Sequence, residues 1–433
     1  MSDYVIQGGR RLHGSVTTNT SKNGAMGLLA AVLLNQQTTI LHDVPDLEEV
    51  KRLYEVLISL GVKIKIDKKS WTITPPKNLN LKKLNRESAL RTRSIIMFLA
   101  PLLMRLKSFK LPHAGGCSLG KRSTFPHGLV AEAFGAKFVK KENDYYISRS
   151  ILKTPGTLVL YESGDTVTEN AVMLASITPG VTTIKMASAN YQVQEVCYFL
   201  KKLGVRIEGI GTTTLKVYGK KVLSKKVEYY LTEDPIESMF FIAVAATTNS
   251  SITIKRCPID FLELELEKLK LMGWKFKIEK KYKAKNKFTD LVDIKTYSSK
   301  LLALPDKIYG RPFPGLNIDN LPFFVPIATQ AEGRTFIHDW AYENRAVYFM
   351  EFAKLGASVS LVDQHRIYID GKTKIKPAEI VAPPALRPAV VLVVAMLAAE
   401  GQSVLRNIYG IERGYEDLCG KLERIGAIIK RID

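Results

Sequence analysis

The chain has 433 residues, 46% of them hydrophobic and 24% charged, which is typical of a globular protein with two or more domains. Its longest apolar run, Ala389 to Ala399, is shorter than the roughly 18 residues that a membrane span needs, so we expect no membrane insertion. The formal net charge of +21 favours anionic partners, whether nucleic acid, membrane surfaces or phosphorylated metabolites.

The N-terminus and the cysteines predict a reducing, cytoplasmic environment. The first residues, MSDYVIQGGR, lack the apolar core of a signal peptide. The four cysteines are scattered without a CxxC pair, which disfavours both a disulfide framework and a zinc site. The six histidines lack HExxH spacing. We therefore expect neither a metal nor a cofactor.

The first candidate site opens a helix near the N-terminus. The segment TSKNGA (20–25) follows the first strand, so Lys22 and Asn23 fall at a helix N-terminus, where anions bind well.

A helix–glycine–strand unit then begins at residue 47. Val50, Leu53, Leu57 and Leu60 fall on one helical face, Gly61 ends the helix in a left-handed conformation, and an alternating strand follows over 62–66. A candidate strand precedes each such helix, the first being TTILHDV (38–44). The phrase recurs six times, as LGVKI, FGAKF, LGVRI, MGWKF, LGASV and IGAII, with glycines 69 to 83 residues apart. This pattern predicts an α/β (α+β) fold with two domains of three units, divided near 231–235.

The loop Leu111–Gly128 is rich in glycine and basic residues. Its stretch GGCSLGKRS nearly matches a nucleotide phosphate-binding loop, but Arg122 stands where a hydroxyl belongs and no Walker-B strand follows, which disfavours a nucleotide hydrolase. Backbone N–H groups in such a turn can form an anion nest. Cys117 beside Lys121 and Arg122 is expected to be reactive, whereas the other three cysteines are expected to be small buried hydrophobes.

Further arginines recur at turns between strands and helices. Singly, each is a surface residue, but together they indicate two domains that close on a polyanionic substrate. Asp319, in a Gly/Pro-rich turn, is either a helix cap or a general base on a substrate hydroxyl. The arginines concerned are Arg91, Arg93, Arg345, Arg387 and Arg413.

These motifs resemble the enolpyruvyl transferases, from GGRRLHGSVTTNTSKNGA to IERGYEDLCGKLERIGAII. The resemblance implies a two-domain inside-out α/β barrel, built from six repeats of about 70 residues with pseudo-threefold symmetry. It implies a first domain over 23–232 and a second formed by 1–22 and 233–433, with the active site in the cleft between them.

Within this family, the motifs are most similar to those of enzymes of peptidoglycan synthesis. The implied reaction transfers the enolpyruvyl group of phosphoenolpyruvate to the 3-hydroxyl of UDP-N-acetylglucosamine. It proceeds by addition and elimination through a tetrahedral intermediate and releases phosphate. Fosfomycin is the implied covalent inhibitor, and no nucleic acid is involved.

The resemblance also assigns roles to individual residues. Cys117 is the general acid that forms an adduct, Asp319 is the base, and Lys22 and Arg413 complete the catalytic set. Phosphoenolpyruvate is assigned to Lys22, Arg93, Arg122, Arg387 and Arg413. The acceptor is assigned to Asn23, Arg93, Ser123, Thr124, His127, Thr166, Asp319 and Arg345.

The acceptor half of the pattern departs from the family. The segment DTVTEN (165–170) is shorter, STFPH (123–127) is unusual, and the loop before Asp319 is about three residues longer. Ala385 and Pro235 replace an aspartate and an arginine. These departures leave open a different nucleotide acceptor such as UMP. A shikimate-3-phosphate acceptor is disfavoured because that relative lacks the cysteine loop, and a nucleic-acid-binding role stays open because RNA 3′-phosphate cyclases share a related repeat.

Overall fold

The structure, a computed structural model, describes residues 2–113, 119 and 123–433, and nearly all of these fall into two compact units. The split unit joins residues 2–19 to residues 233–433, and the internal unit comprises residues 20–113 and 123–232. The division falls between Asn19 and Thr20, so Lys22 lies in the internal unit, whereas the sequence placed the boundary after Lys22. No helix in these described stretches is long and apolar enough to cross a membrane.

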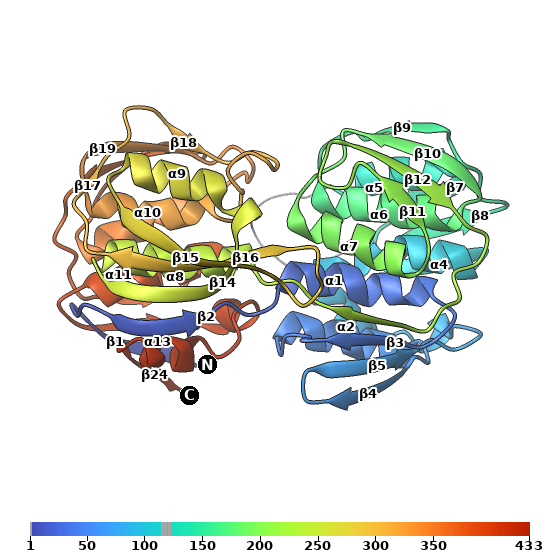
Figure 1. Ribbon diagram of the computed structural model, residues 1–433, viewed down its shortest axis with the longest axis horizontal. Helices are drawn as coiled ribbons and strands as arrows, with labels where there is room; N and C mark the ends of the chain where they lie inside the picture. Colours follow the sequence, from blue (N-terminus) through green and yellow to red (C-terminus); the bar gives the residue numbers. More distant parts are fainter. Residues whose placement is uncertain (1, 114–118, 120–122) are drawn as a thin grey trace. The chain divides into compact units, whose positions relative to one another are not determined.

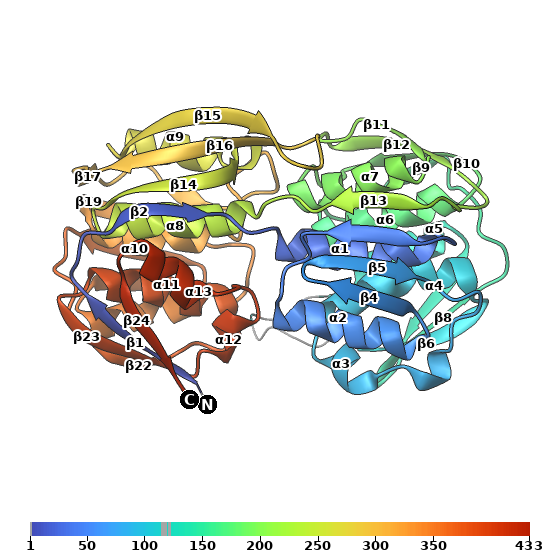
Figure 2. The same cartoon turned by 60° about the horizontal axis from the view of Figure 1, so that its bottom comes forward.

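Three open sheets make up the strand layers of the split unit (Figures 1 and 2). Their strands are β1 (Asp3–Gly8), β2 (His13–Thr17), β14 (Ser251–Pro258), β15 (Lys275–Lys283), β16 (Asp290–Tyr297), β17 (Leu301–Leu302), β18 (Ile308–Tyr309), β19 (Ala331–His338), β20 (Ser358–Asp363), β21 (Arg366–Gly371), β22 (Glu379–Val381), β23 (Gly401–Arg406) and β24 (Ile428–Ile432). The strand orders are β22-β23-β1-β24, β15-β16-β14-β2 and β17-β19-β21-β20, and β18 also pairs with β19.

The internal unit repeats this organisation. Its strands are β3 (Thr39–His42), β4 (Lys63–Asp67), β5 (Ser70–Thr74), β6 (Ser108–Pro112), β7 (Ala136–Lys140), β8 (Asp144–Arg149), β9 (Thr157–Val159), β10 (Gly180–Lys185), β11 (Arg206–Glu208), β12 (Thr214–Gly219) and β13 (Val227–Tyr230). Their orders are β13-β3-β5-β4, β6-β8-β7 and β11-β12-β10-β9. The mixed α/β class is confirmed, and the strands described here form open sheets, none of which closes into a barrel.

Helices cover and connect these sheets. In the internal unit they are α1 (Lys22–Ala31), α2 (Glu48–Ser59), α3 (Arg86–Leu90), α4 (Leu99–Arg105), α5 (Phe125–Ala133), α6 (Asp165–Ile177) and α7 (Tyr191–Lys202), with 3₁₀ helices η1 (Val32–Leu34), η2 (Leu81–Lys83) and η3 (Arg93–Phe98). In the split unit they are α8 (Pro235–Thr247), α9 (Glu263–Leu271), α10 (Phe324–Thr329), α11 (Leu386–Ala398), α12 (Tyr409–Glu412) and α13 (Leu418–Arg424), with η4 (Ile259–Phe261), η5 (Leu321–Phe323) and η6 (Ala346–Leu355).

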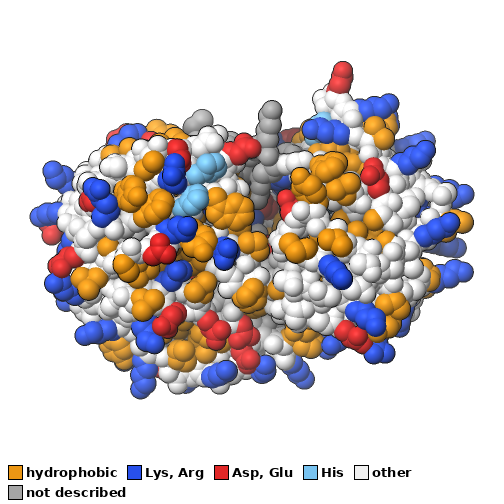
Figure 3. Space-filling view, turned by 90° about the horizontal axis from the view of Figure 1, so that it is seen from above, with side chains coloured by type: hydrophobic (Ala, Val, Ile, Leu, Met, Phe, Trp, Pro, Cys, Tyr) orange, Lys and Arg blue, Asp and Glu red, His pale blue; other side chains and the backbone are white. Residues whose placement is uncertain are grey.

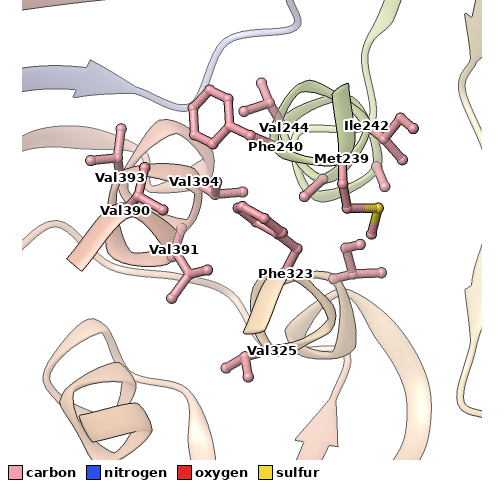
Figure 4. Close-up of a cluster of buried hydrophobic side chains, with 14 of the residues drawn as sticks. Met239, Phe240, Ile242, Val244, Phe323, Val325, Val390, Val391, Val393 and Val394 are labelled. Carbon is pink, nitrogen blue, oxygen red and sulfur yellow. The ribbon is translucent and has the colours of Figure 1, made fainter. Parts of the chain in front are cut away.

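Helices α8, α10 and α11 pack against one another in the core of the split unit. Figure 4 shows Phe323 between Met239 of α8 and Val394 of α11, and all three side chains are fully buried. Nearly all of the longest apolar run of the sequence, 389–399, thus lies in α11, and every residue of the run except Ala398 is buried.

Both ends of the chain belong to the split unit. Strand β1 pairs antiparallel with β23 and β24, so that Tyr4 lies opposite Leu405 and Val5 lies opposite Lys430. Strand β2 pairs in parallel with β14. The N-terminal segment therefore completes two sheets whose other strands come from beyond residue 250.

The six glycine phrases have the local structure that the sequence predicts. Each glycine follows a helix and has a φ between +79° and +92°, the left-handed region in which a side chain is strained. The residue after each glycine is buried, and a strand begins at that residue after Gly135 and one residue later after the other five. The glycines are Gly61, Gly135, Gly204, Gly273, Gly356 and Gly426.

Each of these glycines leads into an edge strand. Strands β4, β7, β11, β15, β20 and β24 all lie at the end of their sheet order. Ile66 is consequently 47% exposed although the alternation predicted an inward-facing side chain, because β4 has a neighbour on one side alone. Exposed basic side chains begin three of these strands, at Lys63, Arg206 and Lys275, and Lys137 is the second residue of β7. On the face seen in Figure 3, Lys and Arg are spread widely and interspersed with acidic side chains.

Comparing alanine substitutions at two glycines of the split unit separates the energetic cost of backbone strain from that of a steric clash. A Cβ on Gly356 would meet nothing closer than Lys376 Cδ at 3.5 Å, whereas a Cβ on Gly273 would lie 2.8 Å from the carbonyl oxygen of Lys300. Gly356→Ala should therefore lower the free energy of unfolding by about 1–2 kcal/mol, the cost of a left-handed alanine. Gly273→Ala should lower it further, as measured by urea denaturation. Equal losses of unfolding free energy in the two variants would contradict the predicted steric clash at Gly273.

Candidate active site

The N-terminus of α1 presents Lys22 and Asn23 at the start of the internal unit. The hydroxyl of Ser21 caps the helix by accepting from Gly24 N–H at 3.1 Å, as the sequence predicts for a helix start. Lys22 Nζ lies 2.7 Å from Glu49 Oε2, and Asn23 donates from Nδ2 to the Tyr191 hydroxyl at 3.1 Å. Sequence reasoning missed Glu49 and Tyr191, which come from α2 and α7.

Two buried glutamates lie against the other face of α1. A Cβ on Gly24 would be 1.8 Å from Glu195 Oε2, and one on Gly27 would be 2.6 Å from Glu169 Oε1, so a side chain at either position would displace a glutamate carboxylate. Burial, and then the carboxylates of Asp165 and Glu195, raise the pKa of Glu169 well above its usual value. Glu195 Oε1 accepts from Thr232 N–H at 2.7 Å. The helix that carries Lys22 and Asn23 is therefore closely fitted to α6 and α7.

His127 belongs to a polar network between α5 and α6. Asn170 Nδ2 donates to His127 Nδ1 at 3.0 Å, so the ring proton resides on Nε2, which lies 3.3 Å from Thr166 Oγ1. Burial, together with the positive charge of Arg93, lowers the pKa of His127 to about 3. The neutral imidazole thus donates its Nε2–H to the Thr166 hydroxyl oxygen. The hydroxyl of Thr166 can in turn donate its own proton to another group. His127 is only 4% exposed, whereas Thr166 lies at the surface.

The remaining predicted residues of the internal unit lie on either side of this network. Arg93 begins η3 after Thr92, whose hydroxyl accepts from Ser94 N–H at 3.2 Å. Ser123 is exposed and its Oγ accepts from Phe125 N–H at 3.0 Å. Thr124 precedes α5 and is buried. Cys117 and Arg122 lie outside the described residues.

In the split unit, the structure brings together Asp319, Arg345 and Arg387. Asp319 Oδ2 lies 3.7 Å from Arg387 Nη2, and Oδ1 lies 3.9 Å from Arg345 Nη1. The interpretation of Asp319 as a helix cap is wrong, because Asn320 occupies the residue before η5. The carboxylate is partly exposed, at 26%, between two guanidinium groups. Such flanking by positive charge favours its ionised form.

Arg345 is completely buried behind Asp319. Its guanidinium donates from Nη2 to Asp339 Oδ1 at 2.9 Å and to the carbonyl of Ile318 at 2.7 Å, and Nε donates to Asp339 Oδ2. It also lies 4.2 Å from the centre of the Tyr342 ring. Arg345, which the sequence assigned to the acceptor, thus holds the backbone that precedes Asp319.

Sequence reasoning missed Tyr415, which is hydrogen-bonded to Arg387 and lies two residues after Arg413 in the chain. Arg387, at the start of α11, donates from Nη1 to the Tyr415 hydroxyl at 3.0 Å. Burial raises the pKa of Tyr415, so the phenol is neutral. Arg413 ends α12 and is half-buried, two residues before Tyr415. In the sequence, this partner is visible as the tyrosine of IERGY.

The other cysteines are poor nucleophiles. Cys197 and Cys257 are fully buried, which raises the pKa of each thiol to about 12, and both are confirmed as small buried hydrophobes. Cys419 is half-buried, with its pKa raised to about 11 by burial. Within the described stretches, no three His, Cys, Asp or Glu side chains come together as a metal site.

Comparisons with known proteins agree with the motifs. The chain matches the family model of EPSP synthase (3-phosphoshikimate 1-carboxyvinyltransferase) over residues 6–422. It is 32% identical to a UDP-N-acetylglucosamine 1-carboxyvinyltransferase from Treponema denticola, with 99% of each chain covered. It is 33% identical to a protein of the same name from Wolinella succinogenes, with 100% of this chain and 99% of the relative covered.

Solved structures show the same fold. The enolpyruvyl transferase NikO from Streptomyces tendae superposes with a TM-score of 0.84 at 22% identity, over 99% of this chain and 98% of that one. An EPSP synthase from Acinetobacter baumannii has a TM-score of 0.77 at 18% identity and full coverage of both chains. From the family match and the full-length relatives, this chain belongs to the enolpyruvyl transferase family.

Proposed function

We propose that this protein transfers the enolpyruvyl group of phosphoenolpyruvate to the 3-hydroxyl of UDP-N-acetylglucosamine, with release of phosphate, as in peptidoglycan synthesis. The names of the full-length relatives support this acceptor. The observation that carries the chemistry is the Asp319 carboxylate between Arg345 and Arg387, 3.9 and 3.7 Å away. An ionised carboxylate can take a hydroxyl proton, and an adjacent arginine can hold the anionic donor.

In the proposed mechanism, Asp319 accepts the proton of the acceptor hydroxyl as its oxygen attacks C2 of phosphoenolpyruvate. Cys117 supplies a proton to C3, which gives a tetrahedral intermediate with a methyl group. The Cys117 thiolate then takes back a proton from that methyl group as the C2–O bond to phosphate breaks, which restores the C2–C3 double bond in the enol ether product. Negative charge on the phosphate and carboxylate would be held by Lys22, Arg93, Arg122, Arg387 and Arg413.

Residues of both units are needed for this reaction, so variants in either unit should affect it.

We further propose that the six helix–glycine–strand units are repeats of one ancestral unit, arranged with pseudo-threefold symmetry in an inside-out barrel. Support comes from the six left-handed glycines and from the five sheets that combine a parallel pair with antiparallel pairs. A cytoplasmic location fits reduced cysteines.

Asp319→Asn tests the base. The amide cannot take the hydroxyl proton, so kcat for phosphate release with UDP-N-acetylglucosamine should fall by about 10²–10⁴-fold. Asp306→Asn, at an exposed aspartate of the same unit, should leave kcat unchanged. Phosphate release from the wild type with UMP but not with UDP-N-acetylglucosamine would establish the alternative acceptor. No release with any acceptor would favour a binding role.

Fosfomycin labelling tests Cys117. In the proposed site the thiolate opens the epoxide of fosfomycin, and the ring oxygen takes a proton. Mass spectrometry should find one adduct, on the peptide that contains Cys117, and Cys117→Ser should abolish both the adduct and most turnover. Cys419→Ser should keep the adduct, because burial raises that thiol's pKa to about 11. An adduct that persists in Cys117→Ser would contradict the assignment.

His127 should influence stability through its suppressed charge. Because its folded pKa of about 3 lies below the unfolded value of about 6.5, the unfolded chain binds more protons between these pH values. Stability is therefore fully present above pH 6.5 and falls with acidification, by up to about 1.4 kcal/mol per pH unit for this group. His127→Gln, which does not titrate, should show a flatter dependence in urea denaturation between about pH 4 and 6. An unchanged slope would contradict the buried neutral imidazole.

A further inference from the structure

A buried carboxylate holds the turn that carries Asp319. Glu265, on α9, is 2% exposed. Its Oε1 accepts from the backbone N–H of Asn317 at 3.2 Å and from Asn320 Nδ2 at 2.8 Å. One oxygen atom therefore restrains the chain two residues before Asp319 and one residue after it.

Asn317 connects this restraint to Asp319 through further hydrogen bonds. Its side-chain oxygen accepts from Asp319 N–H at 2.9 Å. Its backbone carbonyl accepts from the N–H groups of Asn320 at 2.9 Å and Leu321 at 3.0 Å. With Asn320 fully buried, the turn is anchored on its inner side while the Asp319 carboxylate stays partly exposed.

Removing the acceptor would leave the Asn317 N–H and the Asn320 amide without this partner, and the Arg345 bond to the Ile318 carbonyl described above would still restrain the turn's backbone from outside it. A buried amide that loses its partner carries the full cost of its desolvation, so the turn would shift to find water or another acceptor. Burial raises the pKa of Glu265, and the hydrogen bonds from Asn320 and Asn317 oppose that rise. The two donors thus stabilise the charged form that best accepts them.

We propose that Glu265 is a positioning residue for enolpyruvyl transfer. It holds the Asp319 carboxylate at the point where the acceptor hydroxyl gives up its proton, and it does so through the backbone and side chain of Asn317 and the side chain of Asn320. This inference rests on the proposed function, in which Asp319 is the base. Arg345 and Arg387 contact the carboxylate from other directions, so their contacts do not replace this anchor.

The test compares Glu265→Leu with Glu265→Gln. Leucine removes the acceptor, and kcat should fall by about 10- to 100-fold, the typical effect of displacing a reacting group by about 1 Å. The KM for phosphoenolpyruvate should change by less than about twofold, because no cation is removed. Glutamine keeps Oε1 as an acceptor and should restore kcat to within about threefold of wild type. Leu266→Ala, at the next buried residue of α9, should lower the melting temperature but not kcat.

A double-mutant cycle separates this role from mere stability. In an Asp319→Asn background, Glu265→Leu should lower kcat by less than about twofold further, because the group that it positions is already inactive. A full additional loss in that background, or an equal loss in Leu266→Ala, would overturn the proposal. If Asp319→Asn alone retains wild-type kcat, the proposed base fails instead. Should Glu265→Leu not fold, Asn320→Ala takes its place, and wild-type kcat in that variant would overturn the proposal.

Discussion

The ion pair between Arg345 and Asp339 is the interaction on which the candidate site of the split unit depends. Both side chains are fully buried, and breaking such a pair leaves an uncompensated charge in a medium that solvates it poorly. The remaining hydrogen bond of the guanidinium goes to the carbonyl of Ile318, beside Asp319. The chain can therefore keep Arg345 buried only if the backbone before Asp319 stays where it is. This arrangement therefore restrains the position of the Asp319 carboxylate.

In the internal unit, burial shifts the pKa values of two ionisable side chains, Glu169 and His127. Burial, followed by the neighbouring carboxylates of Asp165 and Glu195, raises the pKa of Glu169 well above its usual value. His127 stays neutral near pH 7, because burial and the charge of Arg93 lower its pKa to about 3. Arg345 and Asp339 thus compensate their buried charges by pairing, whereas His127 loses its charge. Lys22 and Arg387 are themselves partly or largely buried and lie near the carboxylates of Glu49 and Asp319, respectively.

Local rules made the fold predictable in part. The glycine after Leu60 could be read as a helix end because three residues suffice to define that conformation, and the same holds at Gly426. The helix start at Ser21 was predictable for the same reason. By contrast, Ile66 was expected to face inward, and its exposure depends on which strand lies beside β4, which the local pattern does not contain.

The candidate site was predictable in residue type but not in arrangement. Arg387 was found by its position in a turn, whereas its hydrogen bond to Tyr415 joins segments that only the fold brings together. The resemblance assigns Arg345 to the acceptor, and an isolated arginine in a sequence gives no sign that its side chain is fully buried. Glu265 carried no signal, since an alternating run of leucine and glutamate reads as an ordinary helix surface.

Part of the net positive charge lies on edge strands, where it can protect the sheets from pairing with another molecule. This role requires no anionic ligand. An open sheet exposes unpaired N–H and C=O groups along its outer strand, and these can join the edge of another molecule into a continuous sheet. In four of the six phrases, a lysine or arginine stands two residues after the glycine, at the first or second residue of the edge strand. Like charges on two approaching edges repel each other, so the repeated basic residue of the glycine phrase protects the protein from aggregation at each of those edges.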